Sequence, residues 1–317
     1  MRIRFSPAFV VILAVPFGPS SAAQLSSKAP AADPNAAAEH AATLAESGRC
    51  KEALPLLTKS LAHLSDKDLQ KRAGFDGVRC ASALQQDEKL LDFLRILNRQ
   101  FPRDPEVLYI SVHAYSDISS RTALELARTA PKSIPALRLD AEADELQGKW
   151  DEAEKDYRKI LEENPNYPGI HFLLARILLS KPNPSPDFKE EAKKELQQEL
   201  EISPTNAGAE YILGELARQA GDFDSAIQHF SKATKLDVTF ADAYLGLGSS
   251  LLTEKNYAEA IPPLEKAVKL QPENPAGHYS LATAYARTGR KEDAQREFAL
   301  HQQTAERAGG QGTQNPQ

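Results

Sequence analysis

Sulfur-bearing residues are scarce in this sequence of 317 residues, and basic residues are fewer than acidic ones. It holds two cysteines, one methionine and one tryptophan, and its 38 lysines and arginines are outnumbered by 44 aspartates and glutamates. The net charge of −6 argues against nucleic acid as a partner, because such proteins use clustered basic residues and none cluster here. With 41% apolar and 26% charged residues, the composition is still that of a globular protein and not of a disordered one.

The sequence also lacks an apolar run long enough to cross a membrane, which takes about 20 helical residues. The best candidate begins at Phe9 and is soon interrupted by Pro16. It follows the basic start Met1–Arg4 and precedes small residues that end at Ala23, an order typical of a secretory signal peptide. We therefore predict cleavage near Ala23 and a periplasmic or secreted protein without membrane insertion. A membrane anchor or an unstructured start is the alternative.

Motifs for catalysis or phosphate binding are absent as well. There is no His-Glu-x-x-His pair, no Gly-x-Ser-x-Gly turn, no Ser-x-x-Lys pair and no Gly-x-x-x-x-Gly-Lys loop. The densest group of candidate ligands is Asp140, Glu142, Asp144 and Glu145, which could hold a metal or share a proton; a solvated acidic face is the simpler interpretation. The sequence thus predicts no catalytic residues, no metal and no cofactor. A periplasmic enzyme or small-ligand carrier that uses Asp140–Glu145 stays open as an alternative.

What the chain does have is a repeat. Residues 207–240, 241–274 and 275–308 form consecutive blocks of 34 residues without a gap. Counting from the start of each block, position 7 is leucine, position 8 glycine or alanine, position 20 alanine, and position 24 phenylalanine or leucine. The apolar spacing in each half is helical. Gly221 and Gly289 at position 15 mark where a first helix ends and the chain turns.

Each block resembles a tetratricopeptide repeat, which is a pair of antiparallel helices. The resemblance extends to 134–167 and to 168–206, where five extra residues at 183–187 are expected in the turn between the helices. It weakens over 34–67, 71–104 and 105–133, the last of which is expected to be a shortened hairpin. The resemblance implies an all-α fold, a right-handed superhelical solenoid of stacked antiparallel hairpins. We expect a signal peptide at 1–23, a flexible linker at 24–35, degenerate hairpins at 36–133, the array at 134–308 and a disordered tail at 309–317.

The resemblance also implies a function. In this family the first helices line the concave side of the solenoid, and position 5 of each points into the groove. Aromatic anchors rimmed by charge are typical of peptide grooves, so we expect a protein or peptide ligand and no enzymatic activity. Self-packing of these side chains, or a structural role in an envelope assembly or export machine, is the alternative. The expected groove residues are Phe172, Tyr211, Leu245 and Tyr279 at position 5, with Arg176, Glu215, Arg218 and Arg287 nearby.

The two cysteines fall at the ends of neighbouring helices in this scheme. Cys50 begins the second helix of the first hairpin, and Cys80 lies near the end of the first helix of the next. Those ends are neighbours in stacked antiparallel helices, so we expect a disulfide in an exported chain. Two buried free thiols are the alternative.

The last block is expected to close the array. Positions that are apolar or small in earlier blocks hold Gln295, His301, Gln302 and Thr304 in this one. Repeat arrays need such a polar face at their ends to stay soluble. The sequence therefore predicts that the array ends with residues 275–308 and that the protein is a monomer.

Overall fold

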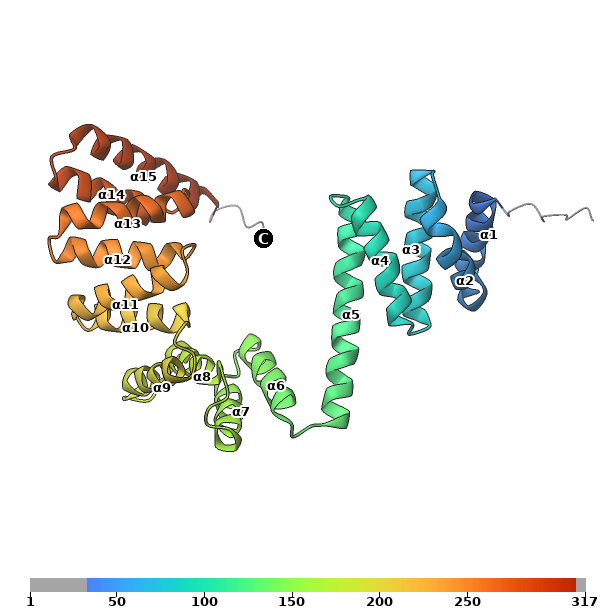
Figure 1. The fold of residues 1–317 in the computed structure, drawn as a ribbon, viewed down its shortest axis with the longest axis horizontal. Helices are drawn as coiled ribbons and strands as arrows, with labels where there is room; N and C mark the ends of the chain where they lie inside the picture. Colours follow the sequence, from blue (N-terminus) through green and yellow to red (C-terminus); the bar gives the residue numbers. More distant parts are fainter. Residues whose placement is uncertain (1–32, 312–317) are drawn as a thin grey trace, which may run out of the picture. The chain divides into compact units, whose positions relative to one another are not determined.

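The computed structural model describes residues 33–311, and the prediction of an all-α chain of stacked helical hairpins is confirmed (Figure 1). No strand occurs between residues 33 and 311. None of the helices in this range combines the length and the apolar character that crossing a bilayer requires. The predicted signal peptide at 1–23 lies outside the described residues, as do residues 24–32 of the linker and 312–317 of the tail.

Helix contacts divide the chain into two units, and the first extends to Arg121. It contains two hairpins, a short 3₁₀ helix η1, and most of a fifth helix that continues past Arg121. Alanines and leucines from these helices form a single core, with Phe93 and Val107 among the buried members. The helices are α1 (Pro34–Glu46), α2 (Cys50–Ser60), η1 (Leu61–His63), α3 (Lys67–Ala83), α4 (Asp87–Gln100) and α5 (Pro105–Thr129).

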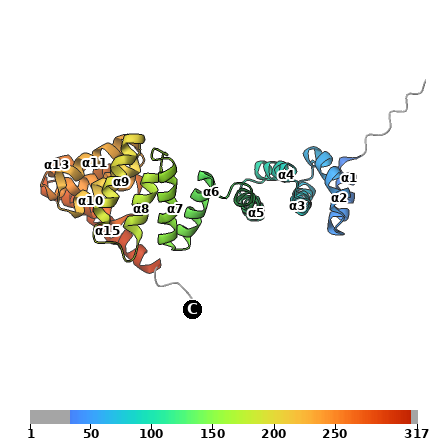
Figure 2. The same cartoon turned by 90° about the horizontal axis from the view of Figure 1, so that it is seen from below.

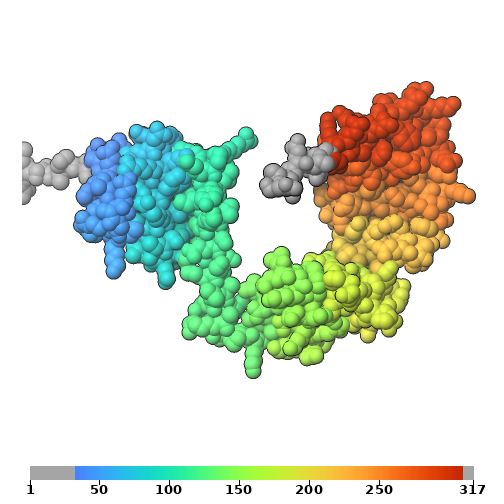
Figure 3. Space-filling model, turned by 180° about the vertical axis from the view of Figure 1, so that it is seen from behind, coloured from blue at the N-terminus to red at the C-terminus, as the bar shows by residue number. Residues whose placement is uncertain are grey.

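The second unit begins at Thr122 and contains five hairpins. Within each pair, the second helix packs along the first, and in all pairs but the last it also contacts the first helix of the next pair (Figures 1 and 2). Figure 3 shows α10 to α15, coloured from yellow to red, filling one continuous body. The pairs are α6 (Ile134–Leu146) with α7 (Trp150–Glu163), α8 (Ile170–Ser180) with α9 (Phe188–Ile202), α10 (Ala207–Gln219) with α11 (Phe223–Leu236), α12 (Ala241–Thr253) with α13 (Tyr257–Leu270), and α14 (Pro275–Arg287) with α15 (Lys291–Gln311).

The small residue at position 8 is required by the distance between the paired helices. A Cβ atom built on Gly214 would lie 2.8 Å from the ring of Phe230, and one on Gly248 would lie 2.4 Å from Cγ of Leu264. Both contacts are closer than real Cβ atoms tolerate. The small residue at position 8 therefore allows the side chain at position 24 to pack directly against the backbone of the first helix. The five inserted residues lie between α8 and α9, as expected.

Six hairpin turns place the residue at position 15 in the left-handed region, where glycine is favoured. In four of them this residue is a glycine, with φ between +71° and +82°. Gln85 and Lys255 occupy the same position in the other two, with φ of +54° and +63°. Residues 71–104 thus turn like the other hairpins although they lack the glycine. The four glycines are Gly48, Gly148, Gly221 and Gly289.

The expected shortened hairpin over residues 105–133 is wrong. Helix α5 runs without a break from Pro105 to Thr129, a length of 25 residues. The segment after Pro105 contains no glycine, proline or asparagine, so it lacks the residues that most strongly interrupt a helix. The two prolines that suggested a hairpin, Pro105 and Pro131, instead lie at the start of the helix and just beyond its end.

The polar face of the last helix is narrower than expected. Gln295 and Gln302 are exposed, but Thr304 is buried and its hydroxyl bonds to carbonyl oxygens of the preceding turn. His301 is half-buried, with Nδ1 2.9 Å from the carbonyl oxygen of Pro275. Two of the four residues expected to face outwards therefore pack within their own hairpin. Helix α15 also continues to Gln311, past the expected boundary at residue 308.

Candidate functional site

The predicted row at position 5 has one member on each of four consecutive first helices. Phe172 lies on α8, Tyr211 on α10, Leu245 on α12 and Tyr279 on α14. The first three are half-buried, whereas Tyr279 is 54% exposed. Each of the four therefore offers part of its apolar surface to solvent.

Neighbouring residues hold the first two aromatic rings. The ring of Phe172 fits against Gly208 of α10, where an added Cβ would lie 3.0 Å from Cζ. The ring of Tyr211 lies between Phe230 and Phe240, with centroid distances of 5.8 Å and 4.8 Å. Burial raises the pKa of Tyr211, with nearby carboxylates adding to the shift, so its phenol stays protonated at neutral pH. The row thus has a rigid apolar part with a polar hydroxyl on Tyr211.

Tyr279 belongs to an aromatic group that the sequence analysis missed. Its ring centroid lies 6.1 Å from that of Phe298 and 5.4 Å from that of His301, both on α15. Phe298 is at position 24, where Phe230 and Leu264 are fully buried, yet it is 37% exposed. No further hairpin follows α15 within the described residues. This last hairpin therefore presents three adjacent rings.

The charged residues expected beside the row are held by ion pairs and ring contacts. Arg218 binds Glu215 through Nε and Nη2, at 3.2 Å and 2.7 Å. Arg287 lies over the ring of Tyr257, with 5.7 Å between Cζ and the ring centroid. Arg176 pairs with Glu145 of the preceding hairpin. Charged residues of both signs therefore flank the row.

The carboxylates of α6 are largely engaged in ion pairs. Glu142 binds Arg138 at 2.8 Å, Asp144 lies 3.3 Å from Nζ of Lys149, and Glu145 holds Arg176. No group of three histidine, cysteine, aspartate or glutamate side chains in residues 33–311 could hold a metal ion. The arrangement here is an ion-paired surface.

Three histidines pair with glutamates of the facing helix, and sequence reasoning did not predict these pairs. In two hairpins the histidine is at position 4 and the glutamate at position 23; in the third the two exchange places. Nδ1 of His171 lies 2.5 Å from Glu195, and Nε2 lies 2.8 Å from the carbonyl oxygen of Pro165. Each imidazole of this kind joins the two helices of its hairpin. The other pairs are His278 with Glu297 and His229 with Glu210, both at 2.6 Å.

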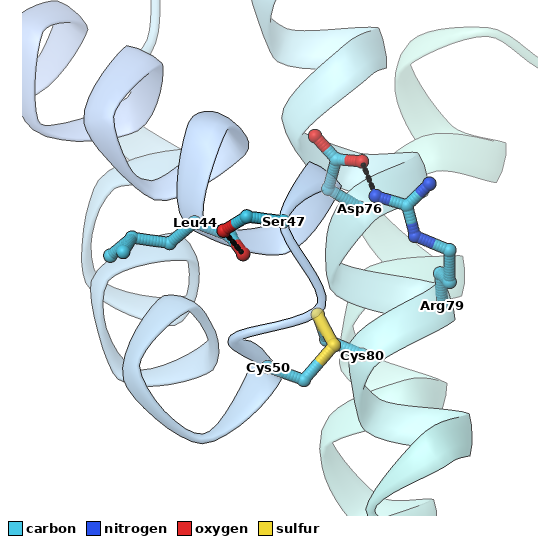
Figure 4. Close-up of a disulfide and its surroundings, with 6 residues drawn as sticks. All are labelled: Leu44, Ser47, Cys50, Asp76, Arg79 and Cys80. Atoms are coloured by element: carbon cyan, nitrogen blue, oxygen red, sulfur yellow. Dashed lines mark hydrogen bonds and ion pairs between the residues drawn. A yellow bond between two sulfur atoms is a disulfide. The ribbon is translucent and has the colours of Figure 1, made fainter.

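The predicted disulfide is confirmed. Cys50 and Cys80 are bonded, with Cα atoms 4.9 Å apart, and the bond joins the start of α2 to the end of α3 (Figure 4). Nearby, Asp76 accepts a hydrogen bond from Arg79 at 2.7 Å, while its buried Oδ2 has no partner in the structure. Burial raises the pKa of Asp76 above the usual range of aspartate.

A cavity of about 370 Å³ lies between α9, α10 and the start of α11. It contains none of the predicted groove residues, so it is separate from the row at position 5. Its walls combine charged residues of both signs and a histidine with apolar residues of α10. They include Lys189, Lys193, Leu213, Leu216, Ser225 and His229.

Comparisons with known proteins agree with the hairpin architecture. A family model described as "Tetratricopeptide repeat" matches residues 142–207 and 211–275, and a second model of the same description matches 251–306. Together these matches span about half of the chain.

Two curated relatives illustrate the similarity. Stress-induced-phosphoprotein 1 of Caenorhabditis elegans is 33% identical over 92 residues, which is 29% of this chain and 29% of that protein. DnaJ homolog subfamily C member 3 of Homo sapiens is 27% identical over 143 residues, which is 45% of this chain and 24% of that protein. The matched segments thus span less than a third of either relative.

Two solved structures are also similar. The MamA protein is 22% identical, with a TM-score of 0.48 over 56% of this chain and 94% of that one. YrrB, described as a TPR protein with an unusual peptide-binding site, is 16% identical, with a TM-score of 0.49 over 57% and 91%.

Proposed function

This chain belongs to the tetratricopeptide repeat family, and we therefore propose that it is a non-enzymatic scaffold that binds a segment of another protein. The observation that carries the proposal is the row Phe172, Tyr211, Leu245 and Tyr279. These side chains come from four successive first helices and keep apolar surface in contact with solvent. Fixed aromatic anchors bind tightly because little side-chain entropy is lost on binding.

The flanking charges add selectivity to this row. Arg218 and Glu215 form an ion pair that is open to solvent, so its free energy is small. A carboxylate or amine of the ligand can therefore replace one partner of the pair at little cost in free energy. Arg287 is exposed beside Tyr257. The expected ligand is therefore an extended or helical segment with apolar side chains and at least one acidic group.

We also propose that the protein acts in an oxidising compartment, either the periplasm or the outside of the cell. Two features support it, namely the signal-peptide pattern of the first 23 residues and the Cys50–Cys80 bond. Sequencing the N-terminus of the protein isolated from its own cells tests this part. A mature protein that begins near Gln24 is the expected result, and an intact Met1 would contradict export with cleavage.

Partner binding is tested by co-purification from the same cells with matched variants. Tyr279→Ala and Arg218→Glu should each weaken binding of the partner by about thirtyfold or more and reduce its recovery accordingly, since aromatic and arginine hot spots contribute about 2 kcal/mol or more. Val238→Ala, at an exposed apolar position outside the row, is the control. Equal recovery by all three variants would mean that the row is not the binding surface.

A further inference from the structure

One face of α5 carries large apolar side chains into solvent. Leu108, Val112 and Tyr115 are 47%, 65% and 50% exposed. They recur every three or four residues, so they form a single stripe along the helix. The adjoining face of the helix is already used, because Val107 and Ala114 are buried in the core of the first unit. The stripe therefore has no partner within this unit.

In a complete hairpin, the second helix covers this side of the first helix. Position 8 is Gly214 in α10 and Gly248 in α12, and a Cβ on either would meet a side chain of the second helix at 2.8 Å and 2.4 Å. Counting from Pro105 as position 1, position 8 of α5 is Val112, and Leu108 precedes it by one helical turn. The stripe is exposed because α5 has no second helix of its own.

The described residues contain no spare helix to fill this place. Each second helix packs mainly along its own first helix: α2 on α1, α4 on α3, α7 on α6, α9 on α8, α11 on α10, α13 on α12, and α15 on α14. The helix left without such a partner is α5. In Figures 1 and 2, α3 and α4 lie on one side of α5, and no helix of the first unit lies on the other.

We propose that α5 is a dimerisation helix, and that two copies of this chain pack their α5 helices antiparallel through Leu108, Val112 and Tyr115. The stripe is nearly symmetric about Val112. With a rise of 1.5 Å per residue, Leu108 lies about 6 Å before it and Tyr115 about 4.5 Å after it. A two-fold axis near Val112 places each Leu108 against Tyr115 of the other copy. The same patch then serves both copies, as a closed two-fold contact requires.

Charge does not oppose this pairing. No aspartate, glutamate, lysine or arginine occurs between Val107 and Ser116, so self-association brings no like charges together along the stripe. The contact is small compared with a standard interface of roughly 1,600 Å², which predicts a dissociation constant on the order of micromolar or weaker. The monomer expected from the sequence rested on the polar face of the last helix, which this contact does not involve.

The oligomeric state of the full mature chain tests the proposal, by analytical ultracentrifugation over a range of concentrations. The wild type should move from monomer to dimer within the micromolar range, and Val112→Glu should stay monomeric. Val238→Glu, at a position 59% exposed in the second unit, should dimerise like the wild type. Val112→Ser replaces the glutamate variant if the latter loses its helical circular dichroism. A wild type that stays monomeric up to several hundred micromolar, or a Val112 variant that dimerises equally well, would overturn the proposal.

The antiparallel register has a separate test. Leu108→Lys and Tyr115→Glu should each weaken self-association, because each places a charge against an apolar side chain. An equal mixture should dimerise again, since the lysine of one copy then faces the glutamate of the other. Failure of the mixture to recover, beside a dimeric wild type, would rule out this register. Neither test touches the row at position 5, so both results are independent of ligand binding.

Discussion

Replacing Lys255 by glycine is predicted to stabilise the second unit, although the change only removes a surface side chain. Lys255 lies in the turn between α12 and α13 with φ of +63°. That conformation costs a residue with a Cβ roughly 1–2 kcal/mol, and glycine avoids the cost. Glycine also has more freedom in the unfolded chain, which takes back about 0.5–1 kcal/mol. The free energy of unfolding should therefore rise by about 0.5–1 kcal/mol.

Urea denaturation followed by circular dichroism measures this change as a higher midpoint with an unchanged slope. The matched control is Glu254→Gly, one residue earlier, where φ is −75°. Glycine relieves nothing at that position and should lower the midpoint. Gln85→Gly, with φ of +54°, should repeat the gain in the first unit. If Lys255→Gly lowers the midpoint as much as Glu254→Gly does, the backbone at position 15 is not strained in these turns, and the reasoning is refuted.

Three further predictions concern the contacts that hold the hairpins. Cys50→Ser should lower the stability of the first unit by about 3–4 kcal/mol, which is the chain-entropy value for a loop of about 30 residues. Denaturation without reductant measures this loss, and an unchanged midpoint would contradict the structural role of the bond. His171→Leu should cost about 1–3 kcal/mol in thermal or urea unfolding, because buried Glu195 loses its partner, while His63→Leu at an exposed site should cost little. Because burial raises the pKa of Asp76, its ionised form is less stable in the folded than in the unfolded chain, so stability falls as pH rises from the unfolded to the folded pKa. Asp76→Asn should remove that loss and therefore stabilise the protein at neutral pH but not in acid. If the melting temperatures of the variant and the wild type differ by the same amount at neutral and at acidic pH, the explanation is contradicted.

The sequence was sufficient to predict the hairpins of residues 134–308, because the repeated positions correspond to specific contacts. Glycine at position 8 and a large apolar residue at position 24 meet directly, as Gly248 and Leu264 do. Because the large side chain at position 24 fits only against a small residue at position 8, the same pair of residue types recurs from block to block. The repeat is therefore visible in a single sequence. The same reasoning located Cys50 and Cys80 at neighbouring helix ends.

The features that were missed depend on less local signals. Glutamine and lysine rarely adopt positive φ, so Gln85 and Lys255 were not recognised as turn residues, although both stand at position 15. The partners in the pairs formed by His171 and His278 are 24 and 19 residues apart, and an inserted segment hides their common register. A signal for α5 was present, because its 25 residues contain no turn-forming glycine or asparagine.

How far the predicted row acts as one groove was beyond sequence reasoning. Position 5 fixes which helix face a residue occupies, but its exposure depends on the next hairpin. Tyr211 is partly covered by Phe240, which precedes α12, whereas no helix follows α15 among the described residues to place an equivalent residue over Tyr279. The two tyrosines therefore differ in exposure although they hold equivalent positions.

Binding along the first helices is tested by site-specific photocrosslinking in the cells that make this protein. A photoreactive residue at Arg218 or Arg287 lies beside the row, and one at Gln228 or Lys269 lies on an exposed face of a second helix. We expect that the first two positions capture the same partner and that the second two do not. Capture of that partner only from Gln228 and Lys269, or equally from all four positions, would contradict binding along the first helices.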